Sequence, residues 1–241
     1  MPAPEPARSA RRPRAAATNP WITPALFRFL RELAENNNRE WFQANKARYR
    51  SVVRDPLLEW IEFIAEDLEK ISPWLRADPS PNGGSLFRIY RDTRFSRDKS
   101  PYKTHAGIHF RHAAGRDVHG PGVYLHLAPR NVFVAAGVWN PGSDALRRIR
   151  QAIVVHPDRF VRATSARRAP LGESERLRRA PRGFDPDHPL IEDLKRKSFL
   201  SSVAFTQREA CSAEFPGLWI RAVRRMAPLM EFLASALKVD W

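Results

Sequence analysis

The sequence contains a single cysteine, Cys211, among its 241 residues. One thiol cannot form an intramolecular disulfide, and it offers no set of thiolates for a metal ion. No run of 18 or more apolar residues is present, and the N-terminus has no apolar segment typical of a secretion signal. We therefore expect a cytoplasmic protein in a reducing compartment that neither spans nor binds a membrane.

Familiar catalytic motifs are also missing. The sequence has no glycine-rich phosphate loop, no Gly-x-Ser-x-Gly turn and no His-Glu-x-x-His helix. Cys211 has no evident histidine partner for nucleophilic catalysis, so we expect it to pack as a small apolar side chain in a helix. These absences predict no cofactor and no metal site, and they leave the reaction class open.

The composition is sufficient for one sizeable core, since 43% of the residues are apolar and 10% are aromatic. Residues 1–20 are the exception, because they combine five prolines and four arginines with almost no large apolar side chain. Such a segment cannot offset the entropy lost on ordering. The sequence thus predicts a disordered basic tail over 1–20 and a single α+β domain over 21–241.

The formal net charge of +15 is compatible with nucleic-acid binding, because clustered cations release counterions from phosphate backbones. Arginine supplies most of the basic residues, however, and the chain is also rich in alanine and proline. All three are encoded by GC-rich codons, so a biased genome can produce this charge without any binding role. Nonspecific surface charge is the first interpretation, and nucleic-acid binding remains an alternative.

Helices are predicted at both ends of the domain. Thr23 can cap a helix with Pro24 in its first turn, Asn38 can cap a second, and Asp55-Pro56 begins a third. The third carries an apolar stripe of Leu and Ile at helical spacing over 57–71. Ser143 can cap a further helix that ends before Pro157, a short helix covers 190–197, and a long C-terminal helix covers 218–237. Residues 159–187 fit no regular pattern.

Short β-branched or aromatic runs separated by turn residues predict a sheet between these helices. Residues 72–84, rich in Pro and Gly, predict a loop before it. The expected fold is α+β, with an antiparallel sheet of about four to five strands packed against an N-terminal helical layer and the long C-terminal helix. The expected strands cover residues 85–91, 105–112, 122–128, 131–139 and 199–205.

Side chains alternate across a strand, so the predicted strands sort residues onto two faces. Ala106, Ile108 and Phe110 face the core, as do Val123, Leu125 and Leu127, and we take Phe87 and Ile89 to do the same. The other face then gathers polar, cationic and aromatic side chains: Arg88, Tyr90, His105, His109, Arg111, Tyr124 and His126.

His105 and His109 are the candidate proton-transfer residues, because imidazole titrates near neutral pH. On one strand they are about 13 Å apart at about 3.3 Å per residue, so one metal ion cannot bind both. Histidines on a sheet face also serve commonly as hydrogen-bonded structural groups.

The connection over 92–103 is long for a hairpin, and long ordered loops often carry function. With Arg88 and Arg91 it holds six cations against only Asp92 and Asp98. Guanidinium groups bind carboxylate or phosphate at two points, and lysine acts as a point charge, so this set suits an anionic ligand. The alternative is an Arg–Asp network that only holds the loop in place.

This segment also carries a resemblance to a known family. The run Phe87-Arg88-Ile89-Tyr90-Arg91-Asp92-Thr93-Arg94-Phe95-Ser96, followed by Asp98-Lys99 and Pro101-Tyr102-Lys103, closely resembles the signature of domain of unknown function 2461, a widespread, mostly bacterial protein family. Further matching stretches are Asn38-Arg39-Glu40-Trp41-Phe42, Asn45-Lys46, Tyr49, Gly137 to Pro141, Ala180 to Phe184 and Leu194 to Phe199. The resemblance spans about 23–237. It implies that the cationic loop, Trp41, Asn45, Lys46 and Lys197 matter to the family's role, and it implies no particular reaction.

The leading hypothesis is a site for a small phosphate or carboxylate ligand, with His105 or His109 transferring protons if the protein is an enzyme. The expected ligand-binding residues are Arg88, Tyr90, Arg91, Arg94, Arg97, Lys99, Lys103, Trp41, Lys46 and Lys197. Two alternatives stand beside it: a nucleic-acid binder that uses the tail and the 147–182 region, and a non-catalytic partner-binding protein. The oligomeric state does not follow from the sequence.

Overall fold

The computed structural model describes residues 18–115 and 120–241. Its N-terminal layer comprises α1 (Pro24–Glu35), α2 (Arg39–Ala44), α3 (Lys46–Tyr49), a π-helical turn (Arg50–Arg54) and α4 (Asp55–Glu69). The predicted starts are confirmed: Pro24 opens α1, and the Asn38 side chain caps α2 by accepting a 2.9 Å hydrogen bond from the Trp41 backbone N–H.

The sheet has five antiparallel strands in the order β1-β2-β3-β4-β5. Their bounds are Leu75–Arg76, Ala106–His112, Gly122–Ala128, Asn131–Val138 and Phe199–Phe205. This confirms the predicted α+β class, and the last four strands lie where alternation placed them. The register aligns His109 with Tyr124, and Tyr124 with Ala135, across three neighbouring strands.

The predicted strand over 85–91 is wrong. The first strand, β1, lies inside the predicted loop, and the later segment meets β2 only through an isolated bridge between Leu86 and Ile108. That bridge places Leu86 in the core and Phe87 on the opposite face, so Phe87 is not the core residue we expected. Ile89 is buried three residues after Leu86, because strict alternation stops once the chain leaves the sheet edge.

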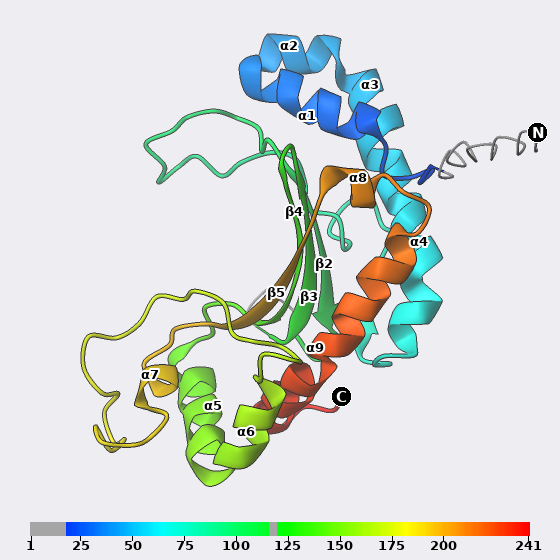
Figure 1. Cartoon of the computed structure of the whole chain (residues 1–241). Coiled ribbons are helices and arrows are strands. Elements are labelled where there is room, and N and C mark those ends of the chain that lie inside the picture. The colour runs from blue at the N-terminus through cyan, green and yellow to red at the C-terminus, as the bar shows by residue number, and fades with distance from the viewer. Residues whose placement is uncertain (1–17, 116–119) are drawn as a thin grey trace, which may run out of the picture.

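The core fills the space between one face of the sheet and the helices. In Figure 1, α4 and the long C-terminal helix α9 (Phe215–Leu237) cover this face. Trp60 of α4, Phe110 of β2 and Trp219 of α9 meet there, with the two indole rings 5.2 Å apart in an edge-on arrangement. The opposite face carries no helix within the described part of the chain. Two long loops, one before β2 and one before α7, extend on this side of the sheet (Figure 1).

Four further helices complete the fold of the described residues, namely α5 (Ser143–Val155), α6 (Pro157–Ala163), α7 (Ile191–Leu194) and α8 (Gln207–Ala210). In Figure 1, α5, α6 and α7 lie at the lower end and α8 lies near α4. Much of the unassigned 159–187 region is an irregular loop that runs beside the β5 side of the sheet. The backbone bonds Gly172 N–H to Leu200 C=O, Leu177 N–H to Lys195 C=O and Lys197 N–H to Glu175 C=O tie it there at 2.8–2.9 Å. The loop therefore covers part of an otherwise open sheet edge.

Residues 18 and 19, which the sequence analysis assigned to the tail, contact the C-terminal part of the domain. Thr18 bridges to Ser212, and the buried Asn19 side chain donates to the Ala210 carbonyl at 3.0 Å. The rest of the predicted tail, residues 1–17, lies outside the described residues. None of the described helices combines the length and the apolar character that a membrane crossing requires.

Candidate functional site

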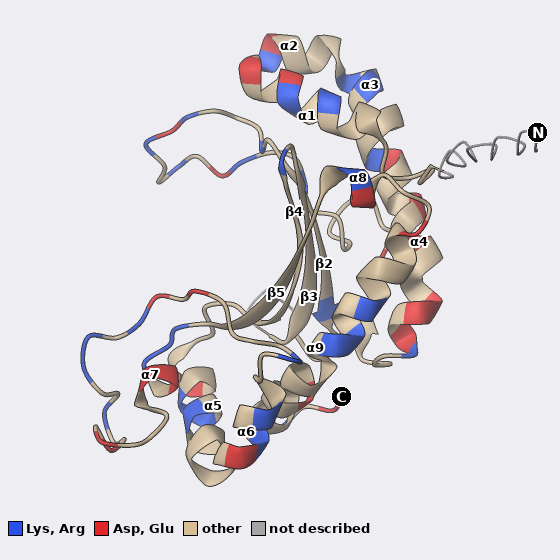
Figure 2. Ribbon diagram, viewed as in Figure 1, with Lys and Arg blue, Asp and Glu red and all other residues tan. Residues whose placement is uncertain are grey.

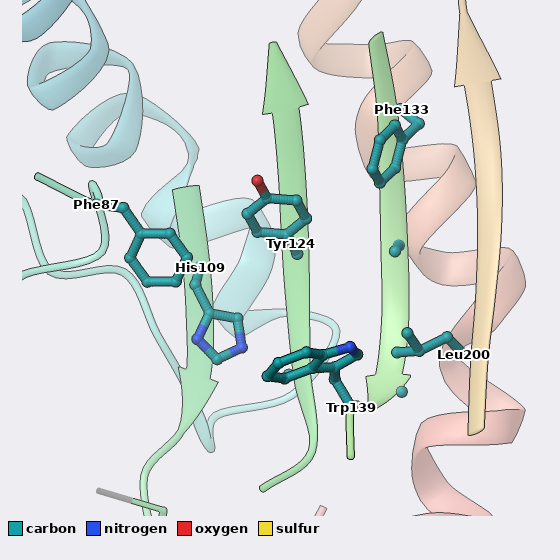
Figure 3. Close-up of a pocket in the computed structure, with 9 residues that line it drawn as sticks. Phe87, His109, Tyr124, Phe133, Trp139 and Leu200 are labelled. Carbon is teal, nitrogen blue, oxygen red and sulfur yellow. The ribbon is translucent and has the colours of Figure 1, made fainter. Parts of the chain in front are cut away.

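A pocket of about 450 Å³ lies on the sheet face that bears no helix (Figure 3). Alternation along β4 makes it: Val132, Val134, Ala136 and Val138 face the core, whereas Phe133, Ala135, Gly137 and then Trp139 face the pocket. Small residues form the floor, namely Gly122, Ala135 and Gly137. Larger side chains form the walls: Phe87, His109, Tyr124, Phe133, Trp139 and Leu200.

Two glycines let the wall side chains lie along the sheet. A Cβ atom on Gly107 would come within 2.6 Å of the Tyr124 hydroxyl, and one on Gly122 would overlap the His109 imidazole at Nε2. Any larger residue at either position would push the ring away from the strand. The two glycines therefore set the orientation of the two polar rings that border the pocket.

A row of rings continues the pocket toward the start of β2. His126 stacks on Phe133 with centroids 4.8 Å apart, and the His105 ring lies 4.5 Å from the His126 ring. The Tyr124 hydroxyl and His126 Nδ1 are hydrogen-bonded at 3.0 Å. His105, Tyr124 and His126 thus share one face, as the sequence predicted.

Burial controls the protonation of these groups. It lowers the pKa of His109 to about 4, with a further contribution from Arg111, and it lowers the pKa of His126 to about 4, with a further contribution from His105. Burial and the nearby Lys103 also lower the pKa of His105. His109 and His126 are therefore neutral at pH 7, and burial makes both imidazoles weaker bases than a histidine in water.

Lys103 lies at the end of this ring row. Its ammonium group is 5.7 Å from the centroid of the Phe87 ring, which itself lines the pocket, and it donates a 2.7 Å hydrogen bond to the Arg88 carbonyl. Within residues 18–115 and 120–241, no carboxylate lies within ion-pair distance of Lys103. Burial, followed by the charge of Arg88, lowers its pKa. The site therefore holds a half-buried cation whose charge is not balanced by the surrounding described residues.

A second hollow of about 530 Å³ adjoins Lys103. Its lining includes Arg91, Asp98, Lys103 and His105, and it reaches Asn37 of the helical layer. The Asn37 side chain holds the backbone of Tyr102, accepting from its N–H at 3.1 Å and donating to its carbonyl at 3.0 Å. The helical layer thereby fixes the segment that carries Lys103.

Two loop arginines are already paired. Arg91 forms an ion pair with Asp98, and Arg94 pairs with Asp92 at 2.7 Å. The hydrogen bond from Arg94 lowers the pKa of Asp92 to about 2, and hydrogen bonds from Ser100 and then Arg91 lower that of Asp98. The Arg–Asp network that we considered as the alternative is thus present for these two residues, and Figure 2 shows the alternating charges along the loop.

The other predicted loop residues are placed differently. Lys99 donates to the Thr93 carbonyl at 2.9 Å, and Arg88 and Arg97 are exposed with no ion-pair partner among the described side chains. Tyr90 does not join the histidine face; its ring packs against Tyr102 at 5.4 Å and Phe42 at 6.1 Å.

Three of the predicted ligand-binding residues, Trp41, Lys46 and Lys197, lie away from Lys103 in the structure. Trp41 packs on Phe29 within the helical layer at 5.7 Å, and Lys46 lies in the short helix α3 of the same layer. Lys197 pairs with Glu175 at 2.8 Å. Lys197 lies just before β5, whose start pairs with the end of β4 and so lies on the same side of the sheet as the end of β2. Lys103 lies just before the start of β2, at the opposite end of the sheet.

Sequence reasoning missed the apolar half of the site, including Phe133, Ala135, Gly137 and Trp139. The signal was present, since these four residues alternate with four core residues in one predicted strand. Arg111 was assigned to the correct face, but it lies toward Asp78, at 4.0 Å.

The described residues form no evident metal-binding site. In the part of the chain that the structure describes, no three His, Cys, Asp or Glu side chains gather in a group suited to a metal ion. His105 and His126 are neighbours, yet no carboxylate or thiolate among the described residues completes a set of metal ligands around them.

Residues 25–232 match the model of a family described as conserved hypothetical protein, DUF2461. The chain belongs to this family. The match covers most of the described chain, including the pocket, the cationic loop and the greater part of α9, and so confirms the resemblance seen in the sequence. No curated protein and no solved structure matches the chain.

Proposed function

We propose that this DUF2461 member binds a small anionic ligand at the free face of the sheet, with Lys103 as the principal cation. The observation that carries the proposal is the environment of Lys103: half-buried, close to Arg88 and without a carboxylate partner among the described residues. A partly desolvated cation beside another cation is costly, and a bound phosphate or carboxylate would remove that cost.

The paired arginines refine the original hypothesis. Arg91 and Arg94 are held by Asp98 and Asp92, so they shape the loop and supply less attraction to a ligand than their number suggests. Lys103 lines the second hollow and, among the described residues, has no carboxylate partner. His105 lines the same hollow as Lys103, and we expect it to be the residue that accepts a proton from a ligand bound there.

Thermal-shift and calorimetric titrations with inorganic phosphate, sugar phosphates and dicarboxylates test this proposal. A ligand at about 100 times its dissociation constant stabilises the fold by about 2.7 kcal/mol, which is readily measured. We expect Lys103→Met to weaken binding at least about tenfold, because loss of a charged hydrogen bond to an anion costs about 1.5–3 kcal/mol.

Lys99→Met is the matched control, since Lys99 lies on the exposed part of the same loop and bonds only to a backbone carbonyl. It should leave the affinity nearly unchanged. Equal effects of the two substitutions would point to general loop charge and would contradict a specific role for Lys103, and no response to any anion would refute the proposal itself.

A further inference from the structure

The aromatic pocket beside Lys103 has the size and wall chemistry of a site for a planar ring. Its volume of about 450 Å³ falls within the range of about 300–1,000 Å³ that is usual for small-molecule sites. The small floor residues, Gly122, Ala135 and Gly137, leave open space between large side chains. Trp139 is 54% exposed although it belongs to this wall, so an apolar surface is left for a ligand to cover.

The polar groups of the pocket suit a heteroaromatic ring better than a hydrocarbon. The His109 imidazole borders the cavity among the apolar rings, whereas the Tyr124 hydroxyl points away from Trp139 and is hydrogen-bonded to His126 (Figure 3). The imidazole can donate or accept a hydrogen bond at the edge of a bound ring. Aromatic walls with a few polar atoms bind nucleobases by stacking, with the ring edges read by hydrogen bonds.

The charge distribution places the anion at one end. Lys103 lies 5.7 Å from the centroid of the Phe87 ring, so a phosphate attached to a ring stacked near Phe87 is within its reach. At the opposite end of the sheet, Lys197 is occupied by Glu175. Among the described residues, unbalanced positive charge therefore adjoins the pocket at the Lys103 end, which suits one phosphate better than a chain of them.

We propose, building on the anion-binding function above, that the pocket holds the base of a mononucleotide whose phosphate contacts Lys103. The inference deepens the proposed function by naming the ligand class. Base stacking in the pocket and phosphate binding at Lys103 contribute separately to the affinity, so a substitution can remove either contribution and leave the other unchanged.

Calorimetric titration with three ligands separates the two contributions: AMP, ribose 5-phosphate and adenosine. We expect AMP to bind about 10- to 100-fold more tightly than ribose 5-phosphate, as loss of one stacked base commonly weakens binding by such a factor. Ala135→Leu, which fills the floor, should reduce AMP affinity to that of ribose 5-phosphate and leave ribose 5-phosphate binding unchanged. Lys103→Met should reduce AMP affinity to that of adenosine.

Trp139→Ala provides a second pocket variant in case the larger residue at position 135 disturbs the sheet. It removes an exposed wall and should weaken AMP and adenosine by a similar factor. Trp74→Ala is its control, because Trp74 is also exposed but stacks on His112, a residue of the opposite sheet face. It should have no effect on either ligand.

The possible failures are distinct. Equal affinity for AMP and ribose 5-phosphate overturns the nucleotide inference and leaves the anion-binding function standing. Adenosine binding as tightly as AMP, with no effect of Lys103→Met, overturns both. Binding of a single-stranded adenine tetranucleotide without any binding of AMP overturns the mononucleotide assignment in favour of nucleic acid.

Discussion

Replacement of His109 with glutamine should remove part of the acid sensitivity of the fold. Burial lowers the pKa of His109 to about 4, whereas in the unfolded chain it returns to about 6.5. Between these values the unfolded chain binds more protons than the folded one, so stability falls as the pH decreases through this window and is fully present above about pH 6.5. Glutamine keeps a polar side chain of similar reach without a titrating ring.

The size of the effect follows from the two pKa values. Between about pH 7.5 and about pH 4.5, linkage gives a loss of about 2.5 kcal/mol from this histidine alone, an upper value because the ring is not fully buried. Other groups titrate equally in both proteins and cancel in the comparison. The unfolding free energy of the variant should therefore fall by about 2 kcal/mol less than that of the original protein across the same pH change.

Urea unfolding followed by tryptophan fluorescence at both pH values measures this difference. His156→Gln serves as the control, because His156 is exposed between α5 and α6. It should lose stability in parallel with the original protein. If His109→Gln loses as much stability on acidification as the original, the imidazole is not held neutral by burial, and the description of the pocket as a site with neutral histidines is refuted.

Two further substitutions test the backbone geometry around the site. Gly137→Ala should destabilise the fold by about 3 kcal/mol or more, since Gly137 has a φ of 141° and a Cβ there would overlap the backbone of β5. Gly142→Ala is its control, because a Cβ at Gly142 would meet open space. In the same urea titration it should change the unfolding free energy by less than about 1 kcal/mol. Arg150→Met should lower the unfolding free energy by about 3 kcal/mol, because the buried guanidinium donates to the Leu194 carbonyl at 2.7 Å and to the Arg196 carbonyl at 3.1 Å, and both carbonyls would lose their donor. Arg147→Met is its control, because Arg147 is exposed on the same helix. Equal losses of stability in the two variants would contradict an anchoring role for Arg150.

Local patterns carried most of the fold prediction. Pro24, Asn38 and Pro56 mark helix starts because the fixed φ of proline and the capping bond of Asn38 act over a few residues, whereas the Thr23 side chain makes no capping bond. The strands β2 to β5 were found because one face of each is buried against the helices. The first strand was misplaced because β1 is only two residues long, and pairing with β2, rather than any local pattern, decides which residues join the edge.

For the site, the sequence placed His105, His109, Tyr124 and His126 on one face, since alternation is a local property of strands. It could not show which loop cations keep an unbalanced charge. Arg91 and Arg94 look equivalent to Lys103 in the sequence, and only the folded loop brings Asp98 and Asp92 to the two arginines while leaving Lys103 beside the sheet.

The sequence by itself determined the class of the fold and the residue types on the free face, because these depend on spacing and alternation along the chain, and its motifs carried the resemblance to the family. The tertiary structure alone decided that Gly122 and Gly137, from neighbouring strands, meet to form a floor, and that Phe87 lies between this pocket and Lys103. Pockets and uncompensated charges depend on distances between segments far apart in the chain. Such distances are set by register and packing, which no local pattern encodes.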